Sequence, residues 1–224
     1  TIFVSENHAM RHNSKSFVHN GMDWDEYTAP NLEQKRNKFH FLGNASWKVK
    51  NLNGAIDVVK FSKKEKLNVL GGVRFNFNMG IRLTFSPKIR FEGMVGGTKK
   101  SELLNSSKGL IFPVKWHEPF GIAITESLFY GCPVFATPYG SLPEIVTNDF
   151  GVLSKDHKEL SDAILSAESF SKRKCHEYGR DVFNSYEMSL AYLEKYKKVM
   201  LGEKLNNTPP CLIEIQEGKY LEWK

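Results

Sequence analysis

Residues 116–146 read WHEPFGIAITESLFYGCPVFATPYGSLPEIV, and the rest of the chain is arranged around this stretch. A Pro-Phe-Gly turn at 119–121 is followed by an apolar run with helical character. Proline is tolerated in a first helical turn, because the N–H that it lacks would have no partner there. The sequence therefore predicts a helix that begins near Phe120 and directs the main-chain amides of Gly121 and Ile122 outward.

Two glutamates flank the predicted helix start. Unpaired amides and the positive end of the helix dipole favour an anion at such a tip, which makes it a seat for a phosphate. Glu118 lies in the loop before the tip, and Glu126 lies about one and a half turns inside the helix. One acid can therefore face a ligand beside the phosphate, and the other a ligand group further along the helix. A sugar on one side and a ribose on the other would fit this geometry.

Apolar runs and helical patterns alternate along residues 39–186. This alternation predicts an α/β domain with a doubly wound, Rossmann-like parallel sheet. The strands are predicted at 39–42, 67–70, 89–91, 109–113, 134–136 and 151–153, and the helices at 51–61, 75–83, 101–107, 118–130, 142–146, 158–170, 172–185 and 187–200. Ligands of such sheets bind outside the carboxyl ends of the strands, and Glu118 follows the strand predicted at 109–113.

Three motifs in order resemble one enzyme family. The pair Glu118 and Glu126, with seven residues between them, is similar to the Glu-x7-Glu signature of the retaining, nucleotide-sugar-dependent glycosyltransferases of family four (glycosyl transferases group one). The segments 131–134 (GCPV) and 140–144 (GSLPE) resemble further motifs of that family. The resemblance covers residues 39–186 and implies a GT-B fold, of which this chain would be the C-terminal, donor-binding half.

The resemblance also implies roles for individual residues. Glu118 would act as a catalytic residue that holds the sugar hydroxyls, and Glu126 would accept hydrogen bonds from the ribose hydroxyls. The helix tip of Phe120, Gly121 and Ile122 would hold the donor diphosphate. Val95 would lie against the nucleotide base, although packing at a strand end is an equally good interpretation of this residue.

One loop departs from the family pattern. The family carries Arg directly after the glycine that matches Gly43, and Lys five residues later, whereas this chain has Asn44 and Val49 there. A one-residue shift assigns the diphosphate-binding role to Lys50, a second catalytic candidate, with Lys48 as the alternative. Replacing the Arg removes a bidentate phosphate clamp, which puts catalytic competence in question.

The implied reaction needs no cofactor and no metal. The donor would be a nucleoside diphosphate sugar, UDP- or GDP-linked, and a hexose would be transferred with retention of its anomeric configuration. The protein's main task is then to stabilise the charge that develops on the leaving diphosphate. Helix amides and a lysine suffice for this, and the sequence has no Asp-x-Asp motif.

We divide the chain into three parts. Residues 1–38 resemble a remnant of an N-terminal domain and a hinge, 39–186 form the nucleotide-sugar domain, and 187–224 form a crossing helix and a tail. The apolar face of the helix at 187–200 is expected to pack on a separate N-terminal acceptor domain, supplied in cis or in trans. The acceptor itself is a glycan, a lipid-linked molecule or a small molecule. For residues 206–224 an edge strand and a loose tail both stay open.

Composition bounds the partners and the compartment. The net charge is +6, but the lysines are spread over helix faces without an aromatic-interleaved basic stripe, so no nucleic-acid partner is expected. A basic chain suits a diphosphate or an anionic membrane surface. The three cysteines show no metal spacing and predict a reducing compartment. We therefore expect a cytoplasmic protein, with peripheral association at the cytoplasmic membrane face as an option.

Two other functions are compatible with the sequence. The chain could be a non-catalytic nucleotide-sugar-binding or scaffold module that lacks both the acceptor domain and the Arg clamp. An epimerase with the same GT-B architecture is a weaker alternative, because the pair of acids and the Pro-Glu loop favour transfer.

Overall fold

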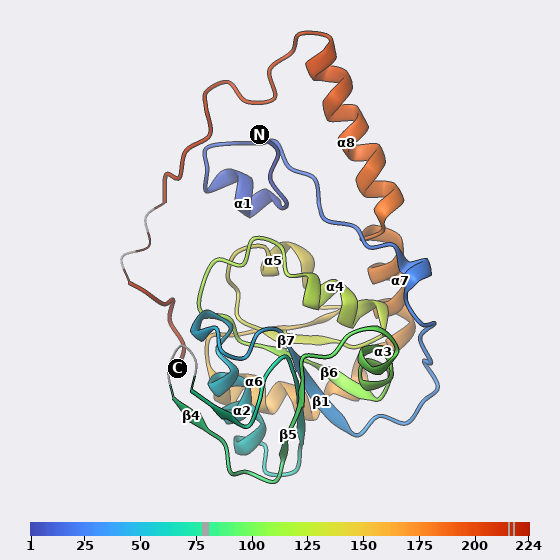
Figure 1. Cartoon of the computed structure of the whole chain (residues 1–224), viewed down its shortest axis with the longest axis vertical. Helices are drawn as coiled ribbons and strands as arrows, with labels where there is room; N and C mark the ends of the chain where they lie inside the picture. Colours follow the sequence, from blue (N-terminus) through green and yellow to red (C-terminus); the bar gives the residue numbers. More distant parts are fainter. Residues whose placement is uncertain (78–80, 215, 217) are drawn as a thin grey trace.

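The chain builds a six-stranded, all-parallel sheet with helices on both faces (Figure 1). The computed structural model describes residues 1–77, 81–214, 216 and 218–224. The strand order is β5-β2-β1-β6-β7-β8. The strands of this sheet are β1 (Lys38–Leu42), β2 (Leu67–Leu70), β5 (Ile89–Gly93), β6 (Ser107–Phe112), β7 (Val134–Ala136) and β8 (Gly151–Leu153).

Side chains alternate between the two faces of the sheet, and each face has its own apolar core. On one face, Phe39, Ile111 and Phe135 pack with α2 (Leu52–Phe61) and α6 (His157–Leu165). On the other, Leu110, Phe112 and Val134 pack with α4 (Ile122–Phe129) and α7 (Lys172–Val182). The third cluster joins α3 (Gly97–Asn105) to the end of α4. Both faces of the central strands are therefore buried, as parallel sheets require.

The predicted doubly wound sheet is confirmed. The chain runs outward from β1 to β2 and β5, then returns to β6 on the other side of β1. Strand order therefore reverses between β1 and β6, and a crevice opens at such a point, outside the carboxyl ends of the strands. This reversal places the loops after β1 and after β6 side by side.

Two predictions about elements need correction. The helix beside the glutamates begins at Ile122 rather than near Phe120, so Pro119 lies in the preceding loop. The prediction of a helix at 75–83 is wrong for the described residues. There β3 (Phe75–Asn76) pairs antiparallel with β4 (Arg82–Leu83). Residues 78–80 of that prediction lie outside the described residues. Here apolar and polar residues alternate with the period of two that is typical of strands, not helices.

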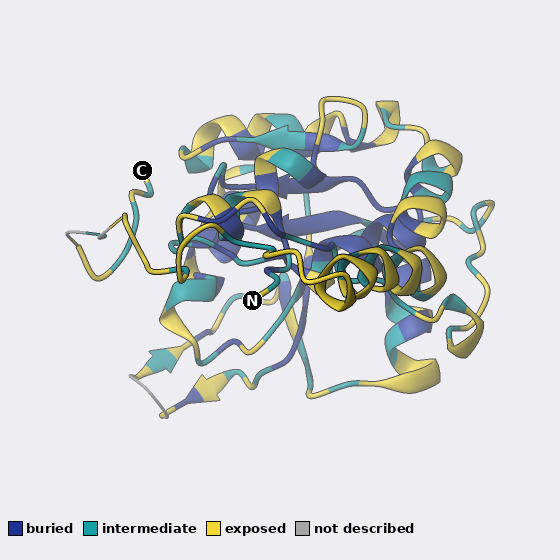
Figure 2. Cartoon of the chain, turned by 90° about the horizontal axis from the view of Figure 1, so that it is seen from above, coloured by how far each residue is buried: buried dark blue, intermediate teal, exposed yellow. Residues whose placement is uncertain are grey.

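The remaining helices lie outside the sheet or next to it. They are α1 (Glu6–Met10), α5 (Leu142–Ile145), α8 (Ser185–Met200) and the 3-10 turns Trp24–Glu26, Lys48–Lys50 and Ala167–Ser169. Helix α8 extends away from the sheet in Figure 1, and its outer turns are exposed in Figure 2. None of its residues is buried.

The tail resolves the alternative that the sequence left open. No strand or helix occurs in the described residues after Met200, so the edge strand is not formed there. The tail nevertheless contacts the rest of the fold. The Cys211 N–H donates to the His12 carbonyl at 3.0 Å, and Trp223 packs against the apolar core beside α2 and α6. Its last residues run beside the loop after β6, where the Leu221 N–H donates to the Lys115 carbonyl at 2.9 Å.

A histidine is buried between the central strands and α4. His40 Nδ1 lies 2.6 Å from Ser107 Oγ, and Nε2 lies 2.8 Å from Ser127 Oγ. Burial lowers the pKa of His40 to about 3 from its ordinary value of 6.5, with the Arg36 charge as a smaller cause. The imidazole is therefore neutral in the folded protein.

This depressed pKa predicts a pH-dependent stability. Below pH 6.5 the unfolded chain binds a proton at His40 that the folded chain does not bind until about pH 3, so the free energy of unfolding falls as the pH drops through this window. For His40→Gln, urea unfolding should show a pH slope smaller by up to about 1.4 kcal/mol per unit below pH 6.5. His8 and His117, whose pKa burial also lowers, are present in both proteins and cancel. Equal slopes would show that His40 takes up a proton in the fold.

Candidate active site

A cleft of about 450 Å³ opens at the carboxyl ends of β1 and β6. Both motif glutamates line it, together with Lys50 and the tip of α4. Residues at the ends of β1 and β6, in the loops that follow them, in α4 and in the N-terminal segment complete the lining. These residues are Val4, Asn20, Leu42, Gly43, Trp47, Phe112, Trp116, Pro119 and Ala123. The strand reversal thus assembles one site from residues that are far apart in the sequence.

Glu118 is held by two donors. Lys50 Nζ lies 2.6 Å from Glu118 Oε2, and the Trp116 indole N–H donates to the same oxygen at 2.9 Å. The ammonium group also lies 5.1 Å from the ring centroid of Phe112 and 5.1 Å from that of Trp116, within cation–π range. Oε1 accepts no hydrogen bond from the residues that the structure describes, which leaves it for a ligand.

Lys50 is placed by a specific turn. It ends the 3-10 turn Lys48–Lys50, and Asn51 follows in the left-handed conformation with φ 53°. Asn51 caps α2 by accepting from the Gly54 N–H at 3.2 Å, and its Nδ2 donates to the Pro113 carbonyl at 2.9 Å. The loop after β1 is therefore fastened to the end of β6 beside Lys50.

Glu126 has a matching pair of donors. The Tyr27 hydroxyl donates to Oε1 at 2.8 Å, and Lys100 Nζ lies 2.5 Å from the same oxygen. Burial raises the pKa of Tyr27, and the Glu126 charge raises it further, so the phenol stays a donor. Within the described part of the chain, Oε2 accepts no hydrogen bond and is open to a ligand.

The tip of α4 supplies main-chain donors between these acids. Gly121 stands before the helix with φ 94°, and no side chain caps the helix among the described residues. Gly121, Ile122 and Ala123 all line the cleft. Phe120 is buried, and its ring packs edge-on against Phe183 at 5.8 Å. An uncapped tip of this kind favours an anionic ligand.

The loop at 137–141 supports the backbone of Glu118. The Ser141 N–H donates to the Glu118 carbonyl at 2.9 Å, and Ser141 Oγ donates to the Phe120 carbonyl at 2.6 Å. Gly140 has φ 65°, and a Cβ there would lie 2.3 Å from both the nitrogen and the carbonyl oxygen of Glu118. This close approach explains the glycine of the GSLPE motif.

The close approach yields a test with a matched control. Gly140→Ala should lower the melting temperature well below that of Gly93→Ala, because both sites have positive φ (65° and 74°) but a Cβ at Gly93 would meet nothing within 4 Å. The control isolates backbone strain, which costs roughly 1–2 kcal/mol. Equal melting temperatures would contradict a tight contact between Gly140 and Glu118.

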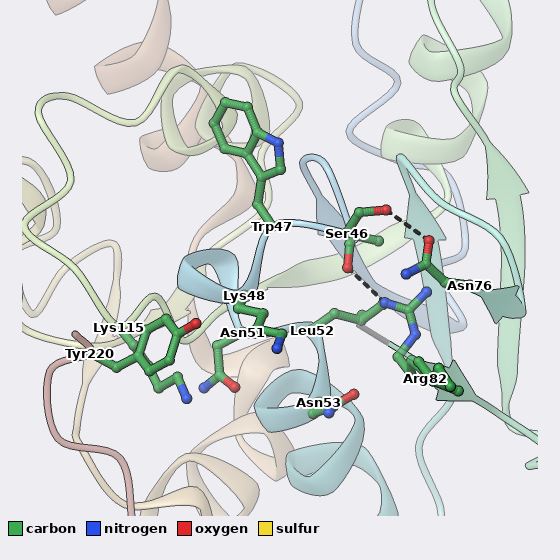
Figure 3. Close-up of a pocket in the computed structure, with 12 residues that line it drawn as sticks. Ser46, Trp47, Lys48, Asn51, Leu52, Asn53, Asn76, Arg82, Lys115 and Tyr220 are labelled. Atoms are coloured by element: carbon green, nitrogen blue, oxygen red, sulfur yellow. Dashed lines mark hydrogen bonds between the residues drawn. The ribbon is translucent and has the colours of Figure 1, made fainter. Parts of the chain in front are cut away.

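The structure separates the predicted site residues into two groups. Glu118, Glu126, Lys50, Phe120, Gly121 and Ile122 line the one cleft. The other three lie outside its lining. Asn44 is exposed, and its Oδ1 accepts from the Ser46 N–H at 3.0 Å. Val95 is partly buried and packs against the apolar cluster that joins α3 to the end of α4. Lys48 lines a different pocket, to which the loop after β1 also contributes Ser46 and Trp47 (Figure 3).

Sequence reasoning missed three residues that hold the acids. Tyr27 fell in a segment interpreted as a linker, and Lys100 was placed before a helix rather than inside α3. Trp116 has no role in the sequence analysis. No local pattern marks Tyr27 or Lys100, since they lie 99 and 26 positions from Glu126 in the sequence.

Neither a metal-binding cluster nor a membrane-spanning helix occurs in the described residues. No group of three or more His, Cys, Asp or Glu side chains is arranged to hold a metal ion in the described part of the chain. Among residues 1–77, 81–214, 216 and 218–224, no helix has the length and apolar character that a membrane span requires.

The fold is that of the C-terminal half of a GT-B glycosyltransferase. It is similar to sucrose-phosphate synthase from Thermosynechococcus elongatus, with a TM-score of 0.70 at 16% identity over 90% of this chain, and to a glycosyltransferase involved in avilamycin A biosynthesis, with a TM-score of 0.72 at 16% identity over 90%. Sequence then fixes the family. The chain belongs to the family described as glycosyl transferases group 1, which matches residues 23–182.

Curated relatives agree over shorter segments. An uncharacterised 41.2 kDa protein in the cps region of Klebsiella pneumoniae is 26% identical over 39% of this chain, and an uncharacterised glycosyltransferase of Methanocaldococcus jannaschii is 28% identical over 49%. These segments span 26% and 28% of the two relatives. The matched solved structures are also longer, since the chain covers 58% of the synthase and 63% of the avilamycin enzyme.

Proposed function

We propose that the cleft binds a nucleoside diphosphate sugar, UDP- or GDP-linked, and supports transfer of its hexose with retention of configuration. The observation that carries this proposal is the arrangement of Glu118 and Glu126. Each acid keeps one oxygen open, and the two line one cleft with the uncapped tip of α4. Among the similar structures, an Anabaena protein was solved in complex with UDP and glucose, at a TM-score of 0.63 and 14% identity.

In this proposal each wall has one task. The amides of Ile122 and Ala123 hold the diphosphate, and Lys50 neutralises the charge that develops on it as the glycosidic bond breaks. Glu118 orients the hexose through its hydroxyls, while Glu126 accepts from the ribose hydroxyls. Val95, just after the end of β5, would border the base. The protein contributes fixed dipoles and one cation, so we propose a reaction that needs no metal.

We further propose that a second, acceptor-binding domain completes the enzyme, in cis or in trans. Helix α8 supports this, because it has no buried residue and exposes an apolar side chain on nearly every turn: Tyr186, Leu190, Leu193, Tyr196 and Met200. The greater length of the matched structures is consistent with it. The acceptor would be a glycan, a lipid-linked molecule or a small molecule.

A non-catalytic binding module is the second candidate. Asn44 stands where the family has its Arg, and its side chain is turned back onto the Ser46 amide. A donor diphosphate would then lack one bidentate clamp. This candidate predicts donor binding without turnover when the acceptor domain is supplied, whereas the enzyme predicts both.

The ribose assignment is testable by calorimetry with UDP and GDP. Glu126→Gln should weaken binding of the preferred nucleotide by roughly 1.5–3 kcal/mol, because a neutral amide replaces a charged acceptor. The control is Glu65→Gln, which also breaks a lysine pair, at 2.9 Å to Lys108, but lies outside the cleft lining. Unchanged affinity in Glu126→Gln, with the melting temperature preserved, would remove Glu126 from the ribose.

The two lysines of the 3-10 turn give a second test. Lys50→Ala should weaken diphosphate binding and flatten its dependence on salt, because one cation in contact with the phosphates is lost. Lys48→Ala removes the same charge two positions away, in a different pocket, and should change affinity little. A larger loss in Lys48→Ala than in Lys50→Ala would transfer the role to Lys48.

A further inference from the structure

The hairpin formed by β3 and β4 is amphipathic with its apolar side turned outward. Odd-numbered side chains of 73–85 are apolar and exposed among the described residues: Val73, Phe75, Phe77, Ile81, Leu83 and Phe85. The described even-numbered side chains, those of Arg74, Asn76, Arg82 and Thr84, are polar, and Asn76 and Thr84 are buried. Figure 2 shows the two strands at one corner of the molecule. A strand pair normally buries its apolar face, so this one presents a surface for something else.

Two arginines fix the polar side of the hairpin to the domain. Arg74 donates to the carbonyls of Thr84 (2.9 Å) and Ile89 (2.6 Å). Arg82 donates to the carbonyls of Ala45 (2.6 Å) and Val73 (2.8 Å). Both guanidinium groups also lie over the Phe91 ring, at 5.8 and 5.3 Å. The outward direction of the apolar face is therefore set by strong charged donors rather than by chance exposure.

A basic pocket adjoins this apolar face. Ile81 and Arg82 of the hairpin line it together with Lys48 and Lys115, as Figure 3 shows for the three cations. None of the described residues that line it is acidic, and the remaining ones are Ala45, Ser46, Trp47, Asn51, Leu52, Asn53, Asn76 and Tyr220. Lys115 Nζ lies 4.7 Å from the centroid of the Tyr220 ring. The pocket thus combines cations with a Trp and a Tyr.

We propose that the hairpin and this pocket together dock the chain on an anionic lipid surface. The exposed side chains of Phe77, Ile81 and Phe85 would enter the boundary between headgroups and acyl chains, and Lys48 and Lys115 would contact lipid phosphates. Trp47 and Tyr220 suit the headgroup level, where amphipathic rings gather. The charge of the described lining residues favours this occupant, because a purely apolar protein surface would bring no negative charge to Lys48, Arg82 and Lys115.

The proposal is independent of glycosyl transfer and is tested by vesicle flotation. The probes are vesicles of phosphatidylcholine alone and of phosphatidylcholine mixed with phosphatidylglycerol. The chain should float with the anionic vesicles only, and added salt should reduce the bound fraction. Ile81→Ser with Phe85→Ser, both 76% exposed, should weaken binding at least about tenfold.

Matched controls separate this surface from general stickiness. Met200→Ser with Leu201→Ser removes two apolar side chains of equal or greater exposure (86% and 79%) from the end of α8 and should leave flotation unchanged. Lys48→Gln with Lys115→Gln should lower affinity by about fivefold per lysine. The control is the pair Lys198→Gln with Lys204→Gln, which removes exposed charge elsewhere and should leave the affinity for vesicles unchanged.

Three results would overturn the proposal. The first is that the chain does not float with anionic vesicles. The second is that the wild type and the Ile81–Phe85 double variant float equally, and the third is that the chain binds neutral and anionic vesicles equally. Light scattering tests a second occupant. If the wild type forms a dimer and does not bind vesicles, and the Ile81–Phe85 double variant is a monomer, the face binds a second copy of the chain. Far-UV circular dichroism confirms that each variant is folded before its result is counted.

Discussion

The contact between Lys50 and Glu118 is the constraint on which the site depends. It joins the loop after β1 to the loop after β6, the two loops that the reversal of strand order brings together. Both side chains are nearly buried, at 13% and 8% exposure. A buried ion pair gains little net stability, but removing one partner leaves an uncompensated charge that costs about 3–5 kcal/mol. Each residue therefore requires the other, and the cleft keeps a fixed charge pattern.

The pair between Lys100 and Glu126 repeats this arrangement on the other wall. There α3 supplies the cation, α4 supplies the acid, and Tyr27 adds a neutral donor from the N-terminal segment. In both pairs the donors converge on a single carboxylate oxygen. The second oxygen of each acid is thereby aimed at the cleft without a competing partner among the described residues. Preorganised acceptors of this kind need little rearrangement when hydroxyl groups arrive.

Local patterns and distant contacts were not equally predictable. The alternation of apolar runs and helical patterns was sufficient to predict the sheet, because the segments 109–112 and 134–136 read as continuous apolar runs of the kind that a parallel sheet buries on both faces. Spacing alone placed Glu118 and Glu126 near one helix tip. It could not show Tyr27 and Lys100 as the partners of Glu126, since nothing in a local pattern encodes contacts across 99 and 26 positions. The hairpin at 73–85 was missed because its position between strands favoured a crossover helix over its own period of two.

The position of the basic pocket connects the lipid proposal with the chemistry of the cleft. Trp47 lines both the pocket and the cleft, so a single loop, 45–50, separates them. One face of this loop presents Lys48, and the other presents Lys50 to Glu118. Under our proposals, a membrane held at the hairpin would bring lipid headgroups to within one loop of the sugar donor. Of the three acceptor classes, a lipid-linked molecule is the one whose reactive end would already be concentrated there, because its other end is anchored in the same surface. This half of the enzyme would then influence the choice of acceptor by its position at the membrane, rather than by direct contacts with the acceptor.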